Sequence, residues 1–306
     1  MASTGFAVLR PRAGVVDSRY LFHWVRSPSF IGEMTRRATG ASYPAVSDRI
    51  VKASELPLPP IEEQRRIAAV LDQADELRSK RRDSFALVDS LNEAIFLDMF
   101  GDPAVNNRGY PTGPLGDIAL KFSDGPFGSN LKSSHYVESG VRVVRLQNIG
   151  VGRFVDDDAA YISEDHFTAL RKHECLPGDV LVGTLGDPNL RACTQPPWLQ
   201  QALNKADCVQ VRVDPSRATS GWLTALLNHP STERLAQGLV LGQTRARISM
   251  GRLRTLVVPV PPIEDQRLFS LKTVAVERQR HRVGRSSEEF DGLFASLQHR
   301  AFAGTL

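Results

Sequence analysis

The hydrophobic pattern is most regular in two stretches of the chain, residues 61–100 and 263–302. In the first, seam positions from Ile67 to Ile95 recur at alternating spacings of three and four. In the second, apolar residues recur every seven positions from Phe269 to Leu297, with polar residues at the positions between them. Such spacings are typical of coiled-coil seams interrupted by polar residues. They predict two long helices.

Each stretch follows a Pro-x-Pro-Pro segment and opens with acidic residues. Proline suits the first helical position, and acids suit the positive end of the helix dipole, so both features predict a helix start. A single amphipathic helix on a globular core would explain one copy, but two equivalent helices in one chain favour pairing with each other. The residues expected in the pairing are Ile67, Val70, Leu77, Val88, Leu91, Ile95, Phe269, Val276, Val283, Phe290, Leu293 and Leu297.

The two stretches belong to an internal repeat. Residues 57–65 read PLPPIEEQR and residues 259–267 read PVPPIEDQR, an offset of 202 positions. The same ungapped offset pairs Ser47 with Ser249 and Phe100 with Phe302, so that residues of about 3–102 duplicate about 205–304. Chance similarity of two proline-rich loops would explain one motif match, but not a register kept over so many positions.

Between the predicted helices, residues 112–262 have a mixed pattern. Short β-like runs at 141–146, 179–183 and 209–213 are separated by Gly, Pro and Asp, and helical patterns fit best near 163–172 and 221–240. The fold class expected for the whole chain is therefore α+β, with a mixed α/β domain joined to long antiparallel coiled-coil helices.

The composition narrows the class of protein. The chain has 306 residues, 42% of them hydrophobic, and a formal net charge of +4, which suits an anionic partner such as DNA without requiring one. It has no run of membrane-spanning length and no signal-peptide core, which predicts a cytoplasmic protein with no membrane partner. Its three cysteines are widely spaced and indicate neither a disulfide framework nor a zinc site.

Motifs of catalysis are not found in the sequence. It contains no Asn/Asp-Pro-Pro-aromatic motif of an amino-methyltransferase, no GxxxxGK[ST] phosphate loop and no HExxH. The histidines are scattered, and residues 156–158 (DDD) are read as an acidic loop tip rather than an ion site. We therefore expect no catalytic residue, metal site or cofactor in this chain.

The pair of PxPPxxEQ-type motifs at the heads of long helices and the Phe-Gly or Phe-Ala-Gly helix ends at 100–101 and 302–304 resemble type I restriction-modification specificity subunits. The segments 124–132 (DGPFGSNLK), 145–149 (RLQNI) and 177–182 (PGDVLV) resemble the framework of that family's target-recognition domains. The resemblance implies two such domains held apart by antiparallel helices, each reading one part of a bipartite site in double-stranded DNA. It also implies modification subunits that use S-adenosylmethionine to methylate adenine, and restriction subunits that use ATP and Mg²⁺ in phage defence.

The repeat and the resemblance together suggest four segments. Residues 57–102 and 263–306 are expected to be the two spacer helices, and 112–262 a complete second target-recognition domain. Residues 1–56 correspond only to the distal part of a first one, because nothing matches 103–204 for the first copy. A truncated gene, a misassigned start, or completion by another chain would each explain this departure, and self-association through the incomplete domain is expected if the chain acts as written.

Two functions of different class stay open from the sequence. The first is a DNA-recognition subunit that positions the modification and restriction subunits on the site. The second is a remnant that has lost recognition but still docks the methyltransferase through its helices.

Residues for DNA contact are expected in loops. Ser129, Asn130 and Lys132 follow a Gly-Pro-Phe-Gly turn, and the amides of Gln147 and Asn148 have the geometry to pair with adenine, although Asn130 and Asn148 would serve equally well as turn caps. Arginines at 245–254 form a basic stretch that would suit phosphate or simply a solvated face. The full set of candidates is Lys121, Ser129, Asn130, Lys132, Arg145, Gln147, Asn148, Arg153, Lys205, Arg245 and Arg247.

Overall fold

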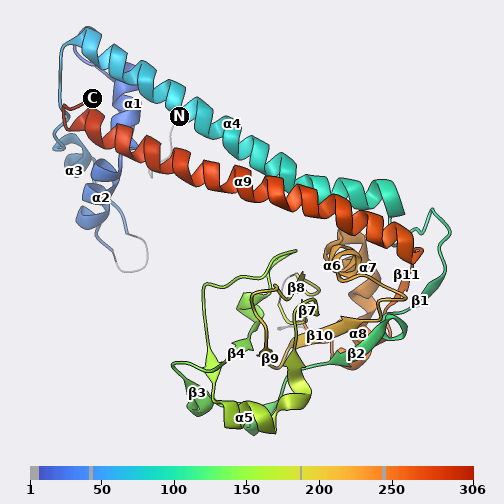
Figure 1. The fold of residues 1–306 in the computed structure, drawn as a ribbon. Coiled ribbons are helices and arrows are strands. Elements are labelled where there is room, and N and C mark those ends of the chain that lie inside the picture. Colours follow the sequence, from blue (N-terminus) through green and yellow to red (C-terminus); the bar gives the residue numbers. More distant parts are fainter. Residues whose placement is uncertain (1–6, 41–43, 187, 243–245) are drawn as a thin grey trace. The chain divides into compact units, whose positions relative to one another are not determined.

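The computed structural model describes residues 7–40, 44–186, 188–242 and 246–306 (Figure 1). The chain forms two compact units: unit 1 comprises residues 1–88 and 278–306, and unit 2 comprises residues 89–277. These boundaries differ from the four expected segments, because each long helix contributes to both units. In the described residues, no helix has the length and apolar composition needed to cross a membrane.

The two long helices are α4 (Ile61–Phe100) and α9 (Ile263–Phe302), each of 40 residues. Both begin directly after a Pro-Pro pair, and their bounds are offset by 202 positions at each end. Helix α4 stops at Gly101, whose φ of +74° is a left-handed conformation that glycine adopts without strain. A Cβ at this position would also overlap the side chain of Asn107, so the helix end requires glycine.

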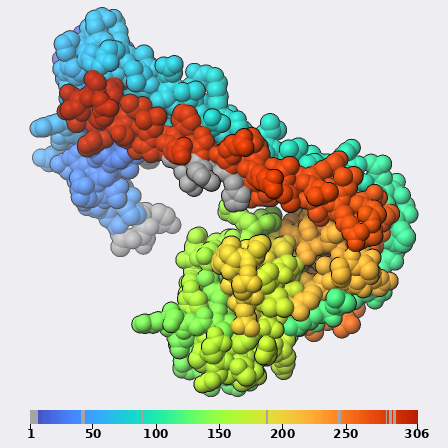
Figure 2. Space-filling model, in the orientation of Figure 1, coloured from blue at the N-terminus to red at the C-terminus, as the bar shows by residue number. Residues whose placement is uncertain are grey.

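Unit 1 is a helical cluster in which α1 (Ser18–Val25), α2 (Pro28–Arg37) and α3 (Asp48–Lys52) precede the start of α4 and are joined by the end of α9. Figure 2 shows the blue surface of these N-terminal helices against the red end of α9. Its core consists of Tyr20, Ile67, Ala68, Leu71, Phe294 and Ala301. Tyr20 is fully buried, and its ring lies 5.3 Å from that of Phe302.

Within its described residues, unit 2 contains three sheets. An antiparallel pair joins β1 (Thr112–Pro114) to β11 (Val257–Pro259). A four-stranded antiparallel sheet has the order β2 (Ala119–Ser123), β10 (Cys208–Val213), β7 (Val180–Gly183) and β8 (Ala192–Thr194). A five-stranded mixed sheet has the order β3 (Tyr136–Val137), β5 (Tyr161–Ile162), β4 (Val141–Val144), β9 (Ala202–Asn204) and β6 (Glu174–Cys175), with β4 and β9 parallel.

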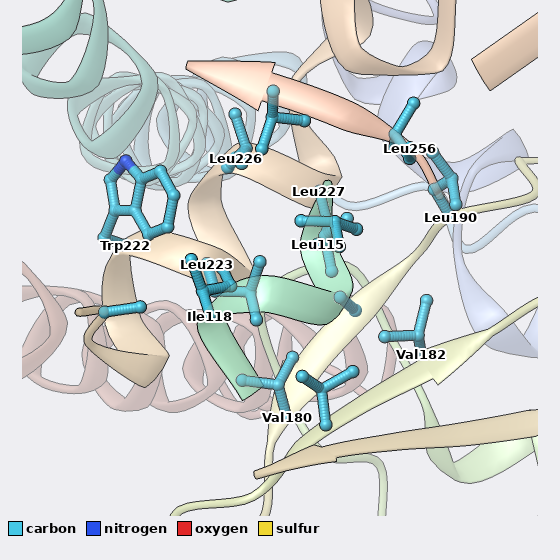
Figure 3. Packing of buried hydrophobic residues seen from close by; sticks show 14 of the residues in the cluster. Leu115, Ile118, Val180, Val182, Leu190, Trp222, Leu223, Leu226, Leu227 and Leu256 are labelled. Carbon is cyan, nitrogen blue, oxygen red and sulfur yellow. The ribbon is translucent and has the colours of Figure 1, made fainter. Parts of the chain in front are cut away.

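The helices of unit 2 are α5 (Glu164–Ala169), α6 (Ser220–Asn228), α7 (Pro230–Ala236) and α8 (Met250–Arg254). Pro230 divides the predicted helical stretch 221–240 into α6 and α7, because proline favours the first position of a new helix over a helix interior. Figure 3 shows the main core, where Trp222 and Leu223 of α6 lie with Val180 of β7.

The residues expected in the helix pairing differ in burial. Ile67, Phe269, Val276 and Val283 are buried, and Val70, Val88, Ile95, Phe290 and Leu297 are half-buried. The prediction was wrong for Leu77, Leu91 and Leu293, which are 45%, 43% and 55% exposed. At these places the next residue along each helix, Arg78, Asn92 or Phe294, makes the contact instead.

The two copies of the repeat fold alike element by element. Helices α3 and α8 have bounds offset by 202 positions, as α4 and α9 have. Gln64 accepts from the Asp17 N–H at 2.9 Å and donates to the carbonyl oxygens of Val15 and Pro59. Gln266 accepts from the Thr219 N–H at 2.9 Å and donates to those of Arg217 and Pro261. All these partners are also 202 positions apart, so the glutamine of each PxPPxxxQ motif ties its helix to the preceding segment.

Candidate nucleic-acid interface

The loops that carry most candidate residues meet at one edge of the unit 2 sheets. Strands β4 and β9 are parallel, so both end at this edge, where the Lys205 N–H donates to the Val144 carbonyl at 2.9 Å. Strand β7 also ends there, because Gly183 pairs with Cys208 at the start of β10. Strand order therefore places the segments after β4, β7 and β9 next to one another.

The loop of residues 125–132 lies against the same edge. Gly125 packs so closely on the backbone of Asn204 and Lys205 that a Cβ would overlap their carbonyl groups. Phe127 lies beneath the guanidinium of Arg247, which is 5.3 Å from the ring centroid. These two contacts hold the start of the loop in place, and its residues Ser129, Asn130 and Lys132 are exposed.

The segment after β4 is occupied by an acidic loop. Arg145 forms an ion pair with Asp158 at 2.6 Å, and the Gln147 side chain donates to the other oxygen of the same carboxylate at 2.7 Å. These contacts, the Gln147 hydrogen bond first, lower the pKa of Asp158. Arg142, a buried neighbour, pairs with Asp156 at 2.7 Å. The acidic tip expected at 156–158 thus neutralises cations of the β4 segment.

Asn148 caps a turn in the structure, which was one of the two roles expected for it. Its amide is therefore not available to pair with a base, and that interpretation is corrected. Its side chain is fully buried. The amide oxygen accepts from the Arg145 N–H at 2.9 Å, and the nitrogen donates to the carbonyl oxygens of Val155 and Asp158. Its hydrogen bonds are made within the loop, which leaves the exposed Gln147 as the amide that can reach a base.

The remaining candidates differ in availability. Lys121 donates from Nζ to the Glu174 carbonyl at 2.8 Å, so its ammonium group already has a partner in the free protein. Lys205 lies 5.6 Å from the Tyr136 ring centroid, and Arg247 pairs with Asp207 at 2.7 Å. Arg153 is exposed. Arg245 lies outside the described residues.

Arg191 is a residue that sequence reasoning missed. Its guanidinium donates to the carbonyl oxygens of Ile149 at 2.9 Å and Leu146 at 3.2 Å, so it joins the start of β8 to the segment after β4. It also lies within reach of the carbonyls of Leu185 and Pro188. An isolated arginine in a Gly- and Pro-rich loop carries no sequence signal for such a role, since Ile149 and Leu146 are 42 and 45 positions away.

The three cysteine thiols are free and buried. Burial raises the pKa of Cys193 and of Cys208 to about 12 and raises that of Cys175, so these thiols stay protonated at neutral pH. Within the described ranges, no three His, Cys, Asp or Glu side chains come together as a metal site. The arrangement at the loop edge offers hydrogen bonds and positive charge rather than a nucleophile.

Comparison with known proteins gives consistent matches. Residues 1–84 match the family model of the type I restriction modification DNA specificity domain. The specificity subunit of the type I restriction enzyme MjaVIII of Methanocaldococcus jannaschii is 20% identical over 292 residues, covering 90% of this chain and 67% of that protein. The MjaIX specificity subunit of the same organism is 28% identical over 98 residues, which is 32% of this chain and 22% of that protein.

Two solved structures share the fold. A chain from a structure of type I restriction-modification complex assembly aligns with a TM-score of 0.63 at 23% identity, covering 99% of this chain and 75% of that one. The specificity subunit from M. genitalium aligns with a TM-score of 0.55 at 13% identity, covering 94% and 73%.

Proposed function

We propose that this chain is a type I restriction-modification specificity subunit, as its matches to that family support. Its unit 2 then recognises one part of a bipartite DNA sequence and catalyses no reaction itself. The observation that carries this proposal is the meeting of four loops at one sheet edge. Exposed short polar side chains, an exposed amide and several cations lie together there. Polar side chains read base edges and cations hold phosphates, so one surface supplies both parts of sequence recognition.

Binding would exchange partners at Arg145 and Gln147. In the free protein both donate to the Asp158 carboxylate, which presents two oxygens as a phosphate does. A DNA phosphate can take the place of this carboxylate because the guanidinium binds both groups through the same hydrogen bonds. Ser129, Asn130, Lys132 and Arg153 need no such exchange, since they are already exposed.

The internal repeat supports the docking of two modification subunits. Two strands of a duplex are related by a two-fold axis, so two methyltransferases that act on opposite strands need equivalent docking surfaces. Helices α4 and α9, with their matched preceding helices, supply two such surfaces. We assign S-adenosylmethionine to the modification subunits and ATP with Mg²⁺ to the restriction subunits, and we place the assembly on DNA in the cytoplasm.

The first test separates recognition from catalysis. The purified chain should bind double-stranded DNA but transfer no methyl group from labelled S-adenosylmethionine and cut no DNA. Together with its modification subunits it should methylate adenine at a defined motif, which single-molecule sequencing of DNA from cells with and without the gene will identify. Methyl transfer by the isolated chain would refute the proposal.

The second test concerns the loop edge. Replacing Ser129, Asn130 and Lys132 by alanine should weaken specific DNA binding by tenfold or more, since loss of a good base contact alone costs about 1–3 kcal/mol. The matched control is Lys80→Ala in unit 1, an exposed lysine that pairs with Glu76 of its own helix. Assembly with the modification subunits should be unchanged in both variants. If the triple variant bound the motif as tightly as the native chain, the site assignment would be wrong.

A further inference from the structure

Two side chains with different roles share one carboxylate in the segment after β4. Arg145 carries a charge that suits a DNA phosphate, whereas Gln147 is a neutral amide that suits a base edge. Nη2 of Arg145 lies 2.6 Å from Oδ1 of Asp158, and the Gln147 amide donates to Oδ2 at 2.7 Å. Because both groups hold the same carboxylate, a movement of the Asp158 side chain releases them together.

The backbone of Asp158 is anchored independently of its carboxylate. The buried amide of Asn148 donates to the Asp158 carbonyl at 3.2 Å and to the Val155 carbonyl at 3.0 Å. Arg145 also donates to the Asp158 carbonyl at 3.0 Å. The Asp158 side chain itself is 57% exposed, so rotation about its side-chain bonds can turn the carboxylate into solvent while the loop keeps its path.

The ion pair with Asp158 leaves a donor of Arg145 unsatisfied. Nε of Arg145 is buried and has no hydrogen-bond partner among the described residues. The strong form of an arginine–carboxylate pair uses two parallel hydrogen bonds from the guanidinium, and exposure to solvent weakens any such pair. The contact between Arg145 and Asp158 is therefore one that a DNA phosphate can replace.

We propose that Asp158 couples base reading by Gln147 to phosphate binding by Arg145, so that the phosphate contact forms on matching DNA and stays closed on other DNA. This inference rests on the proposed recognition of DNA by unit 2. It adds a specificity-determining role for an acidic residue, which acts by holding a cation back.

The coupling follows from the two contacts that break when the carboxylate leaves. On matching DNA, a phosphate replaces the carboxylate at Arg145 and a base edge replaces it at Gln147. On other DNA only the first replacement is made, and Gln147 exchanges a charge-assisted hydrogen bond for a weaker one to water. The closed arrangement is therefore favoured unless the base fits Gln147.

Asp156 provides a comparison within the same loop. Its side chain is 54% exposed, close to the value for Asp158, and it pairs with Arg142 at 2.7 Å. The Arg142 side chain is only 6% exposed, whereas that of Arg145 is 20% exposed. Replacing Asp156 by asparagine therefore removes the same charge from the loop but leaves its arginine buried.

The first experiment measures DNA binding at several salt concentrations by the full chain assembled with its modification subunits. The probes are a duplex that carries the motif found by methylation mapping and a duplex of the same composition with that motif scrambled. Asp158→Asn should tighten binding to the scrambled duplex about two- to fivefold. The slope of the logarithm of the binding constant against the logarithm of the salt concentration should become steeper there by about one, because Arg145 gains a phosphate.

On the motif duplex the slope of Asp158→Asn should stay at the native value, since Arg145 already contacts a phosphate in that complex. Asp156→Asn, the matched control, should keep the native slope on both duplexes. Native slopes for Asp158→Asn on both duplexes, or an equal change on both, would overturn the coupling alone. A loss of affinity confined to the motif duplex would make Asp158 itself a base-reading group and would also overturn it. A native complex that does not distinguish the two duplexes would refute the proposed function, and this inference with it.

The second experiment removes the reader instead of the carboxylate. In Gln147→Ala the base no longer decides whether the carboxylate leaves, so the native difference between the slopes on the two duplexes should shrink by about one. Adding Asp158→Asn to this variant should then change both slopes alike. If the double variant still steepened the slope on the scrambled duplex selectively, the discrimination would not pass through Gln147 and the proposal would be wrong.

Discussion

Arg78 of α4 donates to Asp291 of α9 across 2.7 Å, and its guanidinium also lies 4.2 Å from the ring centroid of Phe294. The arginine side chain is largely buried, while the aspartate is partly exposed. One residue thus joins the two helices of unit 1 by charge and by packing, at a position where the regular hydrophobic repeat would place the neighbouring Leu77.

The first prediction measures this link by a double-mutant cycle. Arg78→Ala and Asp291→Ala should couple by about 0.5–1 kcal/mol, since partial exposure screens the pair. Arg78→Ala alone should cost more than Asp291→Ala, because it also loses the contact with Phe294. Urea unfolding followed by hydrogen exchange of peptides from unit 1 reports on this unit. Arg82, which is 3.2 Å from Asp291 but more exposed, is the control and should show almost no coupling.

A second prediction concerns the seam. Leu91→Asp should change the free energy of unfolding by less than about 1 kcal/mol because the side chain is exposed. Phe96→Ala, five positions along the same helix and fully buried between Phe100 and Phe269, should cost about 3–5 kcal/mol. Thermal unfolding of unit 2 distinguishes the two. A large effect of Leu91→Asp would restore the seam that the sequence spacing predicts.

The third prediction uses the matched glutamines. Gln64→Ala and Gln266→Ala each leave one N–H and two carbonyl groups without their partner, and should each destabilise by about 1–3 kcal/mol. The loss should appear in unit 1 for Gln64 and in unit 2 for Gln266. Hydrogen exchange resolved by peptide will locate it, and an effect of either variant confined to the opposite unit would contradict the equivalence of the motifs.

The fourth prediction is a pH dependence of unit 2. Burial lowers the pKa of His229 below its usual 6.5, so the unfolded chain binds the proton more strongly than the folded one. The contribution of this group to stability is complete above pH 6.5 and is lost progressively as the pH falls below that value. His229→Asn keeps a side-chain acceptor for the Ser231 N–H but cannot titrate. Melting curves between pH 7.5 and 5.5 should therefore be flatter for the variant, and equal slopes would exclude His229 as the cause.

The fifth prediction separates two basic residues on DNA. Arg153→Ala should weaken DNA binding, because this side chain is exposed. The slope of the logarithm of the binding constant against the logarithm of the salt concentration should become shallower by about one, as expected for the loss of one phosphate contact. Lys121→Ala is the matched control, since its ammonium group is held by the Glu174 carbonyl, and its salt slope should stay at the native value. Binding isotherms at several salt concentrations provide the slopes.

Local signals made the long helices predictable. The Pro-Pro pair and the acids that start α4 lie within a few residues of Ile61. The ungapped repeat predicts a second helix start at Ile263, 202 positions later. The fine register of the seam was not accessible in the same way, because it depends on how two helices lie against each other. A shift of one position places Phe294 in the core and Leu293 in solvent.

The candidate site depended on contacts that are distant in sequence. Loop exposure was predictable for Ser129 and Lys132, because Gly and Pro mark a turn. The burial of Asn148 was not, since its partners at Val155 and Asp158 belong to a loop whose path is fixed only by the fold. Arg191 acquires its role from carbonyl groups that no local pattern connects to it.

The division of the chain has a consequence for its evolution. Unit 2 is one uninterrupted stretch, residues 89–277, whereas unit 1 is assembled from both ends of the chain. Genetic recombination with two crossovers, one within each long helix, would exchange the whole reading module as a cassette and leave the remaining helical scaffold in its original register. Both unit boundaries fall inside continuous helices, between residues 88 and 89 in α4 and between residues 277 and 278 in α9. A donor module would therefore have to continue each helix in its existing helical phase.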